Sequence, residues 1–168
     1  QEARDYSGDI DGRASTMHAM IHGGGSPRPD EVAHLKELYA GEVRYVDSQL
    51  ARLFEALQDL GLLDDETCVV FTSDHGEQFG EHGGWLHGDI HCENVRVPLM
   101  VRAPGQAPGL RDDPANLVDV LPTLAGILNV PSLNRGDGRD LLAPDAADSG
   151  IAVHTEYGDQ SRLTGPRY

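Results

Sequence analysis

A short apolar strand that ends in a polar turn is the sequence feature that most constrains this fold. Residues 69–72 read Val-Val-Phe-Thr, and the turn Ser-Asp-His-Gly follows at residues 73–76. This pattern predicts a buried strand that delivers polar side chains to the edge of a sheet. In open α/β sheets, binding sites collect beyond the carboxyl ends of the strands. The turn is therefore the first candidate site.

A second pattern precedes this strand in the sequence. Apolar residues recur at three- and four-residue steps from Asp30 to Leu60, which predicts a long amphipathic helix with one buried face. Gly61 is well placed to end it. Strand, long helix and strand in succession predict a parallel α/β sheet. The other predicted elements are a short helix at 14–21, strands at 67–72, 96–102 and 151–156, a helical turn ending near 94, and a helix at 116–128.

The length of 168 residues suits one α/β domain with a real core. We expect a polar lead-in over 1–29, a helix–strand–loop–strand core with the candidate turn over 30–105, and a C-terminal part over 106–168. The net charge of −15 argues against nucleic acid as a partner, and the sequence has no apolar run long enough for a membrane helix. The N-terminus does not reveal targeting; the cytoplasm is slightly favoured.

Asp74 and His75 are candidate metal ligands. A carboxylate beside a neutral imidazole is a mixed oxygen and nitrogen donor pair, which does not by itself choose among calcium, magnesium, manganese and zinc. Adjacent residues in extended backbone point apart, so a turn is needed, and Gly76 supplies the freedom for it. A second cluster of such side chains follows downstream: Glu81, His82, His87 and His91. Each of the three histidines, taken alone, fits a loop residue better than a ligand.

Several segments together resemble the sulfatase family of the alkaline phosphatase superfamily. They occur in the family's order and cover about residues 35–156. The segments are 38–47 (Leu-Tyr-Ala-Gly-Glu-Val-Arg-Tyr-Val-Asp), 71–83 (Phe-Thr-Ser-Asp-His-Gly-Glu-Gln-Phe-Gly-Glu-His-Gly), 96–99 (Arg-Val-Pro-Leu), 118–124 (Val-Asp-Val-Leu-Pro-Thr-Leu) and 137–142 (Asp-Gly-Arg-Asp-Leu-Leu). The resemblance implies a mostly parallel sheet flanked by helices, incomplete at its N-terminus, and a metal-dependent hydrolase acting on a small-molecule or glycan sulfate ester.

The resemblance also implies roles for individual residues. Asp74 matches a divalent metal ligand, usually calcium in this family, with zinc or manganese as alternatives. His75 occupies the neighbouring metal-site position, which is often Asn. His87 falls where the family carries a Lys or His that contacts the sulfate or the leaving-group oxygen. Glu81 and His82 match a recurrent segment without a chemical step, and they would simply fix the loop.

One part of the family pattern is missing. Sulfatases carry a Cys/Ser-x-Pro-x-Arg motif whose first residue becomes the formylglycine nucleophile. Neither Cys68 nor Cys92 is followed by this pattern, and no serine fits it. Since covalent catalysis needs nucleophile and metal together, we expect the nucleophile outside this sequence and little or no turnover by these 168 residues alone.

Two other interpretations stay open. Phosphoethanolamine transferases on the same fold also show a Ser-Asp-His-Gly-Glu turn followed by a Leu-His-Gly, like residues 86–88 here. His87 would then be a zinc ligand in a phosphoryl-transfer enzyme. The Arg-Val-Pro-Leu segment and the Asp-x-x-Pro-Thr helix favour a sulfatase over that alternative. The third interpretation is a non-catalytic, truncated sulfatase-like domain that binds partners through its acidic surface.

Overall fold

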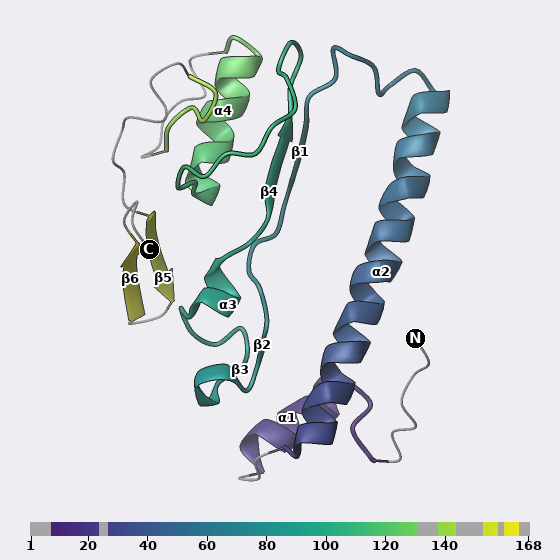
Figure 1. Ribbon diagram of the computed structural model, residues 1–168, viewed down its shortest axis with the longest axis vertical. Coiled ribbons are helices and arrows are strands. Elements are labelled where there is room, and N and C mark those ends of the chain that lie inside the picture. Colours follow the sequence, from purple (N-terminus) through teal and green to yellow (C-terminus); the bar gives the residue numbers. More distant parts are fainter. Residues whose placement is uncertain (1–7, 24–26, 131–137, 144–152, 158–159, 165–168) are drawn as a thin grey trace. The chain divides into compact units, whose positions relative to one another are not determined.

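Helices and strands are mixed along the chain in the computed structural model, as an α/β class requires (Figure 1). The structure describes residues 8–23, 27–130, 138–143, 153–157 and 160–164. Two units share these residues. The first unit consists of Gln1–Leu62 with Glu77–Leu86, and the second consists of Leu63–Gly76 with His87–Tyr168. Among the described helices, none is both long and apolar enough to cross a membrane.

The long apolar repeat folds as α2 (Pro29–Asp59), which confirms the predicted helix. Its start is fixed by a capping box, in which the Arg28 amide donates to Glu31 Oε2 at 2.7 Å. Gly61 lies just beyond its end with φ +69°, and its amide donates to the Gln58 carbonyl at 2.9 Å. α1 (Ala14–His22) precedes it, as the sequence also predicts.

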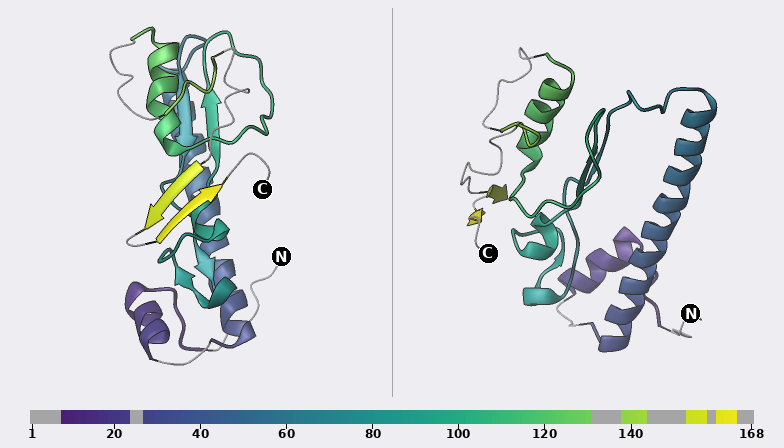
Figure 2. Two further views of the ribbon diagram at one scale, coloured as in Figure 1. Left: turned by 90° about the vertical axis from the view of Figure 1, so that its left-hand side faces the viewer. Right: turned by 45° about the horizontal axis from the view of Figure 1, so that its top comes forward.

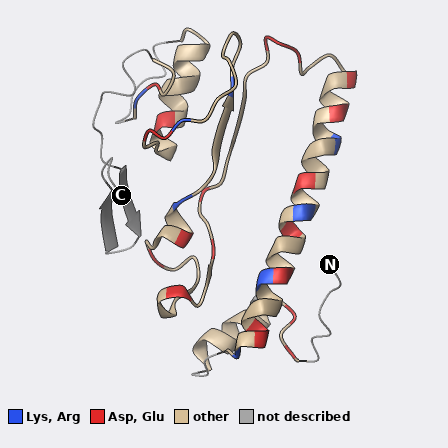
Figure 3. Cartoon of the chain, viewed as in Figure 1, with Lys and Arg blue, Asp and Glu red and all other residues tan. Residues whose placement is uncertain are grey.

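The predicted buried face of α2 is fully buried only at Leu35. Further along the helix, Leu50, Phe54 and Leu57 are half-buried. Leu35 is 4% exposed, whereas Val43, Val46 and Leu53 are 53%, 50% and 50% exposed. A periodic sequence and its own hydrogen bonds are enough to form a helix, but burial needs a second layer of structure. Among the described residues, such a layer buries Leu35 fully and leaves the rest of the face half-buried or exposed. Figure 3 shows acidic and basic residues alternating along the rest of α2.

A small hairpin contacts the N-terminal part of α2. β2 (Gln78–Phe79) pairs antiparallel with β3 (Trp85–Leu86), and the 3₁₀ helix η1 (Glu81–Gly83) joins them. Gly80 enters the connection with φ +95°, a conformation that favours glycine. The sequence predicts only a Gly-rich loop here, because two-residue strands are too short to show a period.

Two side-chain contacts attach the hairpin to α2. The Tyr39 and Phe79 rings meet edge to face with centroids 5.4 Å apart. Lys36 Nζ donates to Glu81 Oε1 at 2.8 Å, and the second oxygen of this carboxylate accepts the Phe79 amide at 2.6 Å. Lys36, the only lysine of the chain, therefore joins the helix to the connection within the hairpin.

In the second unit, the apolar run forms β1 (Val69–Thr72), which pairs with β4 (Leu99–Arg102) from Val69↔Arg102 to Thr72↔Leu99. Both strands lie within their predicted ranges, but the pair is antiparallel, as Figure 2 shows. The predicted parallel sheet is thus not seen among the described strands. A parallel return needs a crossover of a dozen or more residues, usually a helix. The only described α-helix between these strands is α3 (Cys92–Val95), of four residues.

The predicted helix near 116–128 appears as η2 (Leu117–Asp119) followed by α4 (Val120–Ile127), with Pro122 in the first turn of α4. Asp119 is 4% exposed and accepts two backbone amides: that of Asn116 at 2.8 Å and that of Arg139 at 2.9 Å. One carboxylate therefore caps the helix and anchors a segment twenty residues further along.

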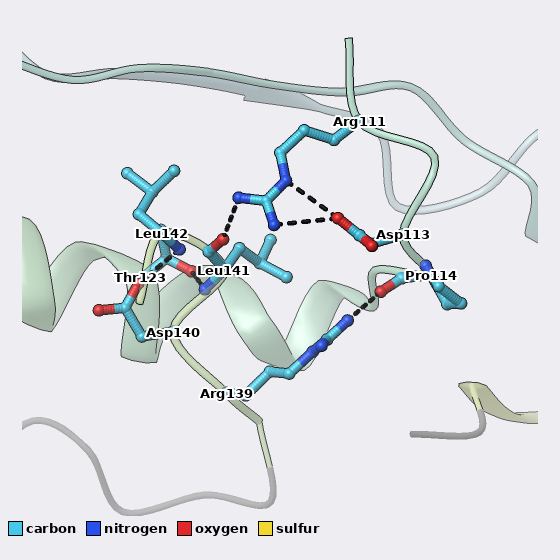
Figure 4. Close-up of polar contacts among 8 residues, drawn as sticks. All are labelled: Arg111, Asp113, Pro114, Thr123, Arg139, Asp140, Leu141 and Leu142. Carbon is cyan, nitrogen blue, oxygen red and sulfur yellow. Dashed lines mark hydrogen bonds and ion pairs between the residues drawn. The ribbon is translucent and has the colours of Figure 1, made fainter. Parts of the chain in front are cut away.

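Residues 138–143 are held to this helix by further polar contacts (Figure 4). The Leu141 amide donates to Thr123 Oγ1 at 2.9 Å, and Thr123 is 1% exposed. Arg111 donates to the Leu141 carbonyl at 2.8 Å and to Asp113 Oδ2, while Arg139 donates to the Pro114 carbonyl. This cluster, which we call the α4 anchor, ties three separate segments together.

The last strands are β5 (Val153–Tyr157) and β6 (Gln160–Thr164), which pair antiparallel from Val153↔Thr164 to Tyr157↔Gln160. The strand predicted at 151–156 overlaps β5, although residues 151 and 152 lie outside the described residues. The sequence does not predict β6.

Candidate functional site

The polar turn follows β1 directly, as the sequence predicts. Ser73 Oγ donates to the His75 carbonyl at 2.8 Å, and the His75 amide donates to Asp74 Oδ1 at 3.0 Å. The hydrogen bond from the His75 amide holds the pKa of Asp74 below its ordinary value, with the nearby imidazole as a weaker cause. The Asp74 carboxylate is therefore ionised at neutral pH, and its side chain is 87% exposed.

His75 presents a second donor atom from the same turn. Its Nδ1 donates to the Gly76 carbonyl at 2.8 Å, which leaves the lone pair of the neutral ring on Nε2. That nitrogen lies 3.8 Å from Asp74 Oδ2. The turn thus does what adjacent residues in an extended strand do not, because it brings an oxygen and a nitrogen donor to the same place.

An oxygen and a nitrogen donor suit zinc or manganese in kind, whereas calcium prefers oxygen ligands alone, and two donors are too few for any of these ions. Calcium takes six to eight oxygen ligands and zinc usually takes four ligands. Among the described residues, no group of three or more His, Cys, Asp or Glu side chains could hold a metal ion. The Asp74–His75 pair is therefore at most a partial metal site, which needs ligands beyond those described here.

The third predicted site residue lies against this pair. The His87 ring stacks on the His75 ring with centroids 4.0 Å apart and an interplanar angle of 25°. The two residues are twelve positions apart in the sequence. The pairing of Gln78 with Leu86 reverses the chain between them, which brings His87 back next to the turn. Asp74, His75 and His87 thus form one exposed cluster.

Glycine is needed at position 76 for a different reason from the predicted one. Its backbone is not in the left-handed region, so conformational freedom does not explain it. Its amide donates to the Asn94 carbonyl at 2.6 Å, and a Cβ at this position would overlap the Glu93 carbonyl oxygen. Only glycine lets the turn approach the backbone of α3 this closely.

A network around Asp89 lies in the segment that follows His87, and the sequence analysis missed it. Asp89 Oδ1 accepts the His91 amide at 2.9 Å and Asn94 Nδ2 at 3.0 Å, and His91 Nδ1 lies 2.9 Å from the same oxygen. These hydrogen bonds help to hold the pKa of Asp89 below its ordinary value against the opposing effect of burial. The Asp-x-His-x-x-Asn spacing was the available signal, but it has no periodic pattern.

Glu81 has a structural environment, in line with the expectation that it fixes the loop. Hydrogen bonds from Lys36 first, and then from the Phe79 amide, lower its pKa from an ordinary 4.5 to about 2. His82 adopts a φ of +59° in η1. Cys68 is partly buried and Cys92 is exposed, and neither forms a disulfide.

Comparison with known families decides what kind of domain carries this cluster. Residues 4–130 match the sequence model of the family described as Sulfatase, which is more than half of the chain. The chain belongs to the sulfatase family. The matched range includes α2, the Asp74–His75 turn, His87 and α4, so the elements that shape the cluster lie within the family domain.

Individual named proteins are similar to this chain over part of their length. Choline-sulfatase of Rhizobium meliloti (strain 1021) is 37% identical over 60% of this chain and 20% of its own length. The multifunctional alkaline phosphatase superfamily protein PehA of Trinickia caryophylli is 34% identical over 77% of this chain and 26% of its own length. Arylsulfatase K of Danio rerio is 31% identical over 67% of this chain and 22% of its own length. The matches thus span about a fifth to a quarter of each relative.

Proposed function

We propose that the Asp74–His75 turn and His87 are part of the active site of a metal-dependent sulfuric ester hydrolase. The stack of the His75 and His87 rings carries this proposal, because it brings a candidate metal ligand and a candidate proton donor to one place at the end of β1. The names of the similar choline-sulfatase and arylsulfatase K support a small-molecule sulfate ester as the substrate.

Each residue has a defined task in this proposal. The ionised Asp74 carboxylate and His75 Nε2 hold a divalent cation, with calcium as the proposed ion and zinc or manganese as alternatives. A cation bound there would supply Lewis-acid chemistry, by polarising an oxygen of the sulfate group. His87 in its protonated form donates its proton to the departing alkoxide as the sulfur–oxygen bond breaks. The nucleophile that forms the new bond to sulfur is a formylglycine outside these 168 residues.

The test uses the protein expressed from its complete coding sequence. Hydrolysis of para-nitrophenyl sulfate and of choline sulfate is measured before and after EDTA treatment, and calcium is then added back. We expect EDTA to abolish turnover and calcium to restore it. His87→Ala is expected to lower kcat by about 100-fold, the size of a general-acid contribution. His18→Ala, an exposed histidine on α1, is the matched control and keeps full activity.

Several outcomes would contradict the proposal. Turnover of a phosphodiester but no sulfate ester, with tightly bound zinc, would assign the chain to phosphoryl transfer. Absence of any turnover, together with absence of Cys/Ser-x-Pro-x-Arg in the complete coding sequence, would indicate a non-catalytic domain. The isolated 168-residue chain serves as a negative control, and sulfate hydrolysis by it would refute the placement of the nucleophile outside this sequence.

A further inference from the structure

The turn that carries Asp74 and His75 contacts the backbone of α3 in the second unit. Gly76 ends the turn, and its amide donates to the Asn94 carbonyl at 2.6 Å. The missing Cβ of Gly76 leaves room for the Glu93 carbonyl. The position of the turn therefore depends on where the backbone of α3 lies.

α3 does not hold this position by its own stability. It has four residues, and an isolated helix needs roughly 12 to 15 residues to be even marginally stable in water. Asn94 is 2% exposed, and its Nδ2 donates both to the Asp89 carbonyl oxygen at 3.1 Å and to Asp89 Oδ1 at 3.0 Å. The same carboxylate oxygen also accepts the amide of His91, the residue that precedes the helix.

We propose that Asp89 and Asn94 are positioning residues for the cation held by the Asp74–His75 turn. Asp89 fixes the start of α3 and the Asn94 side chain, and the Asn94 main chain fixes Gly76. This inference rests on the proposed function, since it assigns the residues that support the metal site. When residues that hold metal ligands in position without binding the metal are removed, metal affinity typically falls by about 10- to 100-fold.

The experiment measures calcium affinity by isothermal titration calorimetry, with calcium chloride as the only probe, on the protein from its complete coding sequence. Asp89→Ala and Asn94→Ala are expected to weaken binding by about 10-fold. Asp89→Asn keeps an acceptor oxygen for the His91 amide and Asn94 Nδ2, so it is expected to restore most of the affinity. Cys92→Ser, an exposed change on α3, is the matched control with unchanged affinity.

Two results would distinguish a failure of the proposed metal site from a failure of the proposed positioning role. If Asp74→Asn leaves calcium affinity unchanged, the metal site of the proposed function is wrong. If Asp74→Asn abolishes binding but Asp89→Ala and Asn94→Ala bind like the wild type, the positioning role is wrong. Circular dichroism at the titration temperature verifies that each variant is folded. Should Asp89→Ala fail to fold, Asn94→Ala decides the question. A purely structural role would lower the unfolding midpoint but leave the affinity of the folded protein unchanged.

Discussion

Two aspartates of the second unit show how differently this fold uses the same side chain. Asp119, at the start of α4, is 4% exposed, and one of its oxygens accepts the Asn116 amide while the other accepts the Arg139 amide. The side chain of Asp74, at the end of β1, is 87% exposed and accepts the amide of its neighbour His75. One carboxylate is committed to the backbone, and the other faces solvent.

This difference separates a structural carboxylate from a candidate ligand. A buried charge is tolerated only when hydrogen bonds replace the water that it has lost, and removing it leaves its donors without partners. An exposed carboxylate keeps most of its lone pairs for water or for a cation. The comparison therefore predicts opposite responses when the two side chains are removed.

The largest effect on stability is expected for Asp119→Ala. It leaves two half-buried amides without an acceptor, which should cost about 3 kcal/mol of unfolding free energy. The value is measured by urea denaturation at neutral pH. Asp112→Ala, an exposed aspartate nearby, is the control with no measurable change. A loss below about 1 kcal/mol at Asp119 would mean that water replaces the carboxylate easily, and the contrast with Asp74 would weaken.

An intermediate, pH-dependent effect is expected for Glu81→Gln. The pKa of Glu81 falls from 4.5 to about 2 in the folded state, so the stabilisation is complete above pH 4.5 and is lost as the pH falls toward 2. The Glu81 and Lys36 side chains are 33% and 50% exposed, so solvent screens their ion pair, and we expect it to contribute about 1 kcal/mol to the unfolding free energy. Urea denaturation should show this deficit in the variant at pH 7 and a smaller one at pH 3.

The control for Glu81→Gln is Glu55→Gln on the exposed part of α2, which should match the wild type at both pH values. An equal deficit for Glu81→Gln at pH 7 and pH 3 would show that the lowered pKa does not contribute. The Lys36–Glu81 pair would then be a surface contact of little weight.

The smallest effect on stability is expected for Asp74→Ala. Its side chain is exposed, and water replaces it around the His75 amide, so the change should stay within about 0.5 kcal/mol. Urea denaturation without added metal provides the measurement, with Asp119→Ala alongside it. A loss comparable to that of Asp119→Ala would show that Asp74 is part of the structural framework, and it would remove the distinction on which its proposed role depends.

Much of the local structure could be predicted from the sequence. The periodic residues of α2, the breaker Gly61 and the Pro122 turn of α4 act through neighbours in the chain, so their effects can be read locally. The antiparallel pairing of β1 with β4 could not be predicted, because strand direction depends on the connection between the strands and not on their composition. The two-residue strands of the 78–86 hairpin are too short to show a pattern.

The candidate site likewise combines features that the sequence predicts with features that only the structure reveals. The sequence by itself provided the candidate residues, since Asp74 and His75 follow a strand and His87 falls at a position where sulfatases carry a Lys or His. Only the tertiary structure decided that the His87 ring stacks on His75, that Gly76 is needed for room rather than for freedom, and that Asp89 and Asn94 support the turn. Residue types and local spacing determine which groups a chain offers. Contacts between residues distant in the sequence decide which groups meet, because they depend on how the whole chain folds.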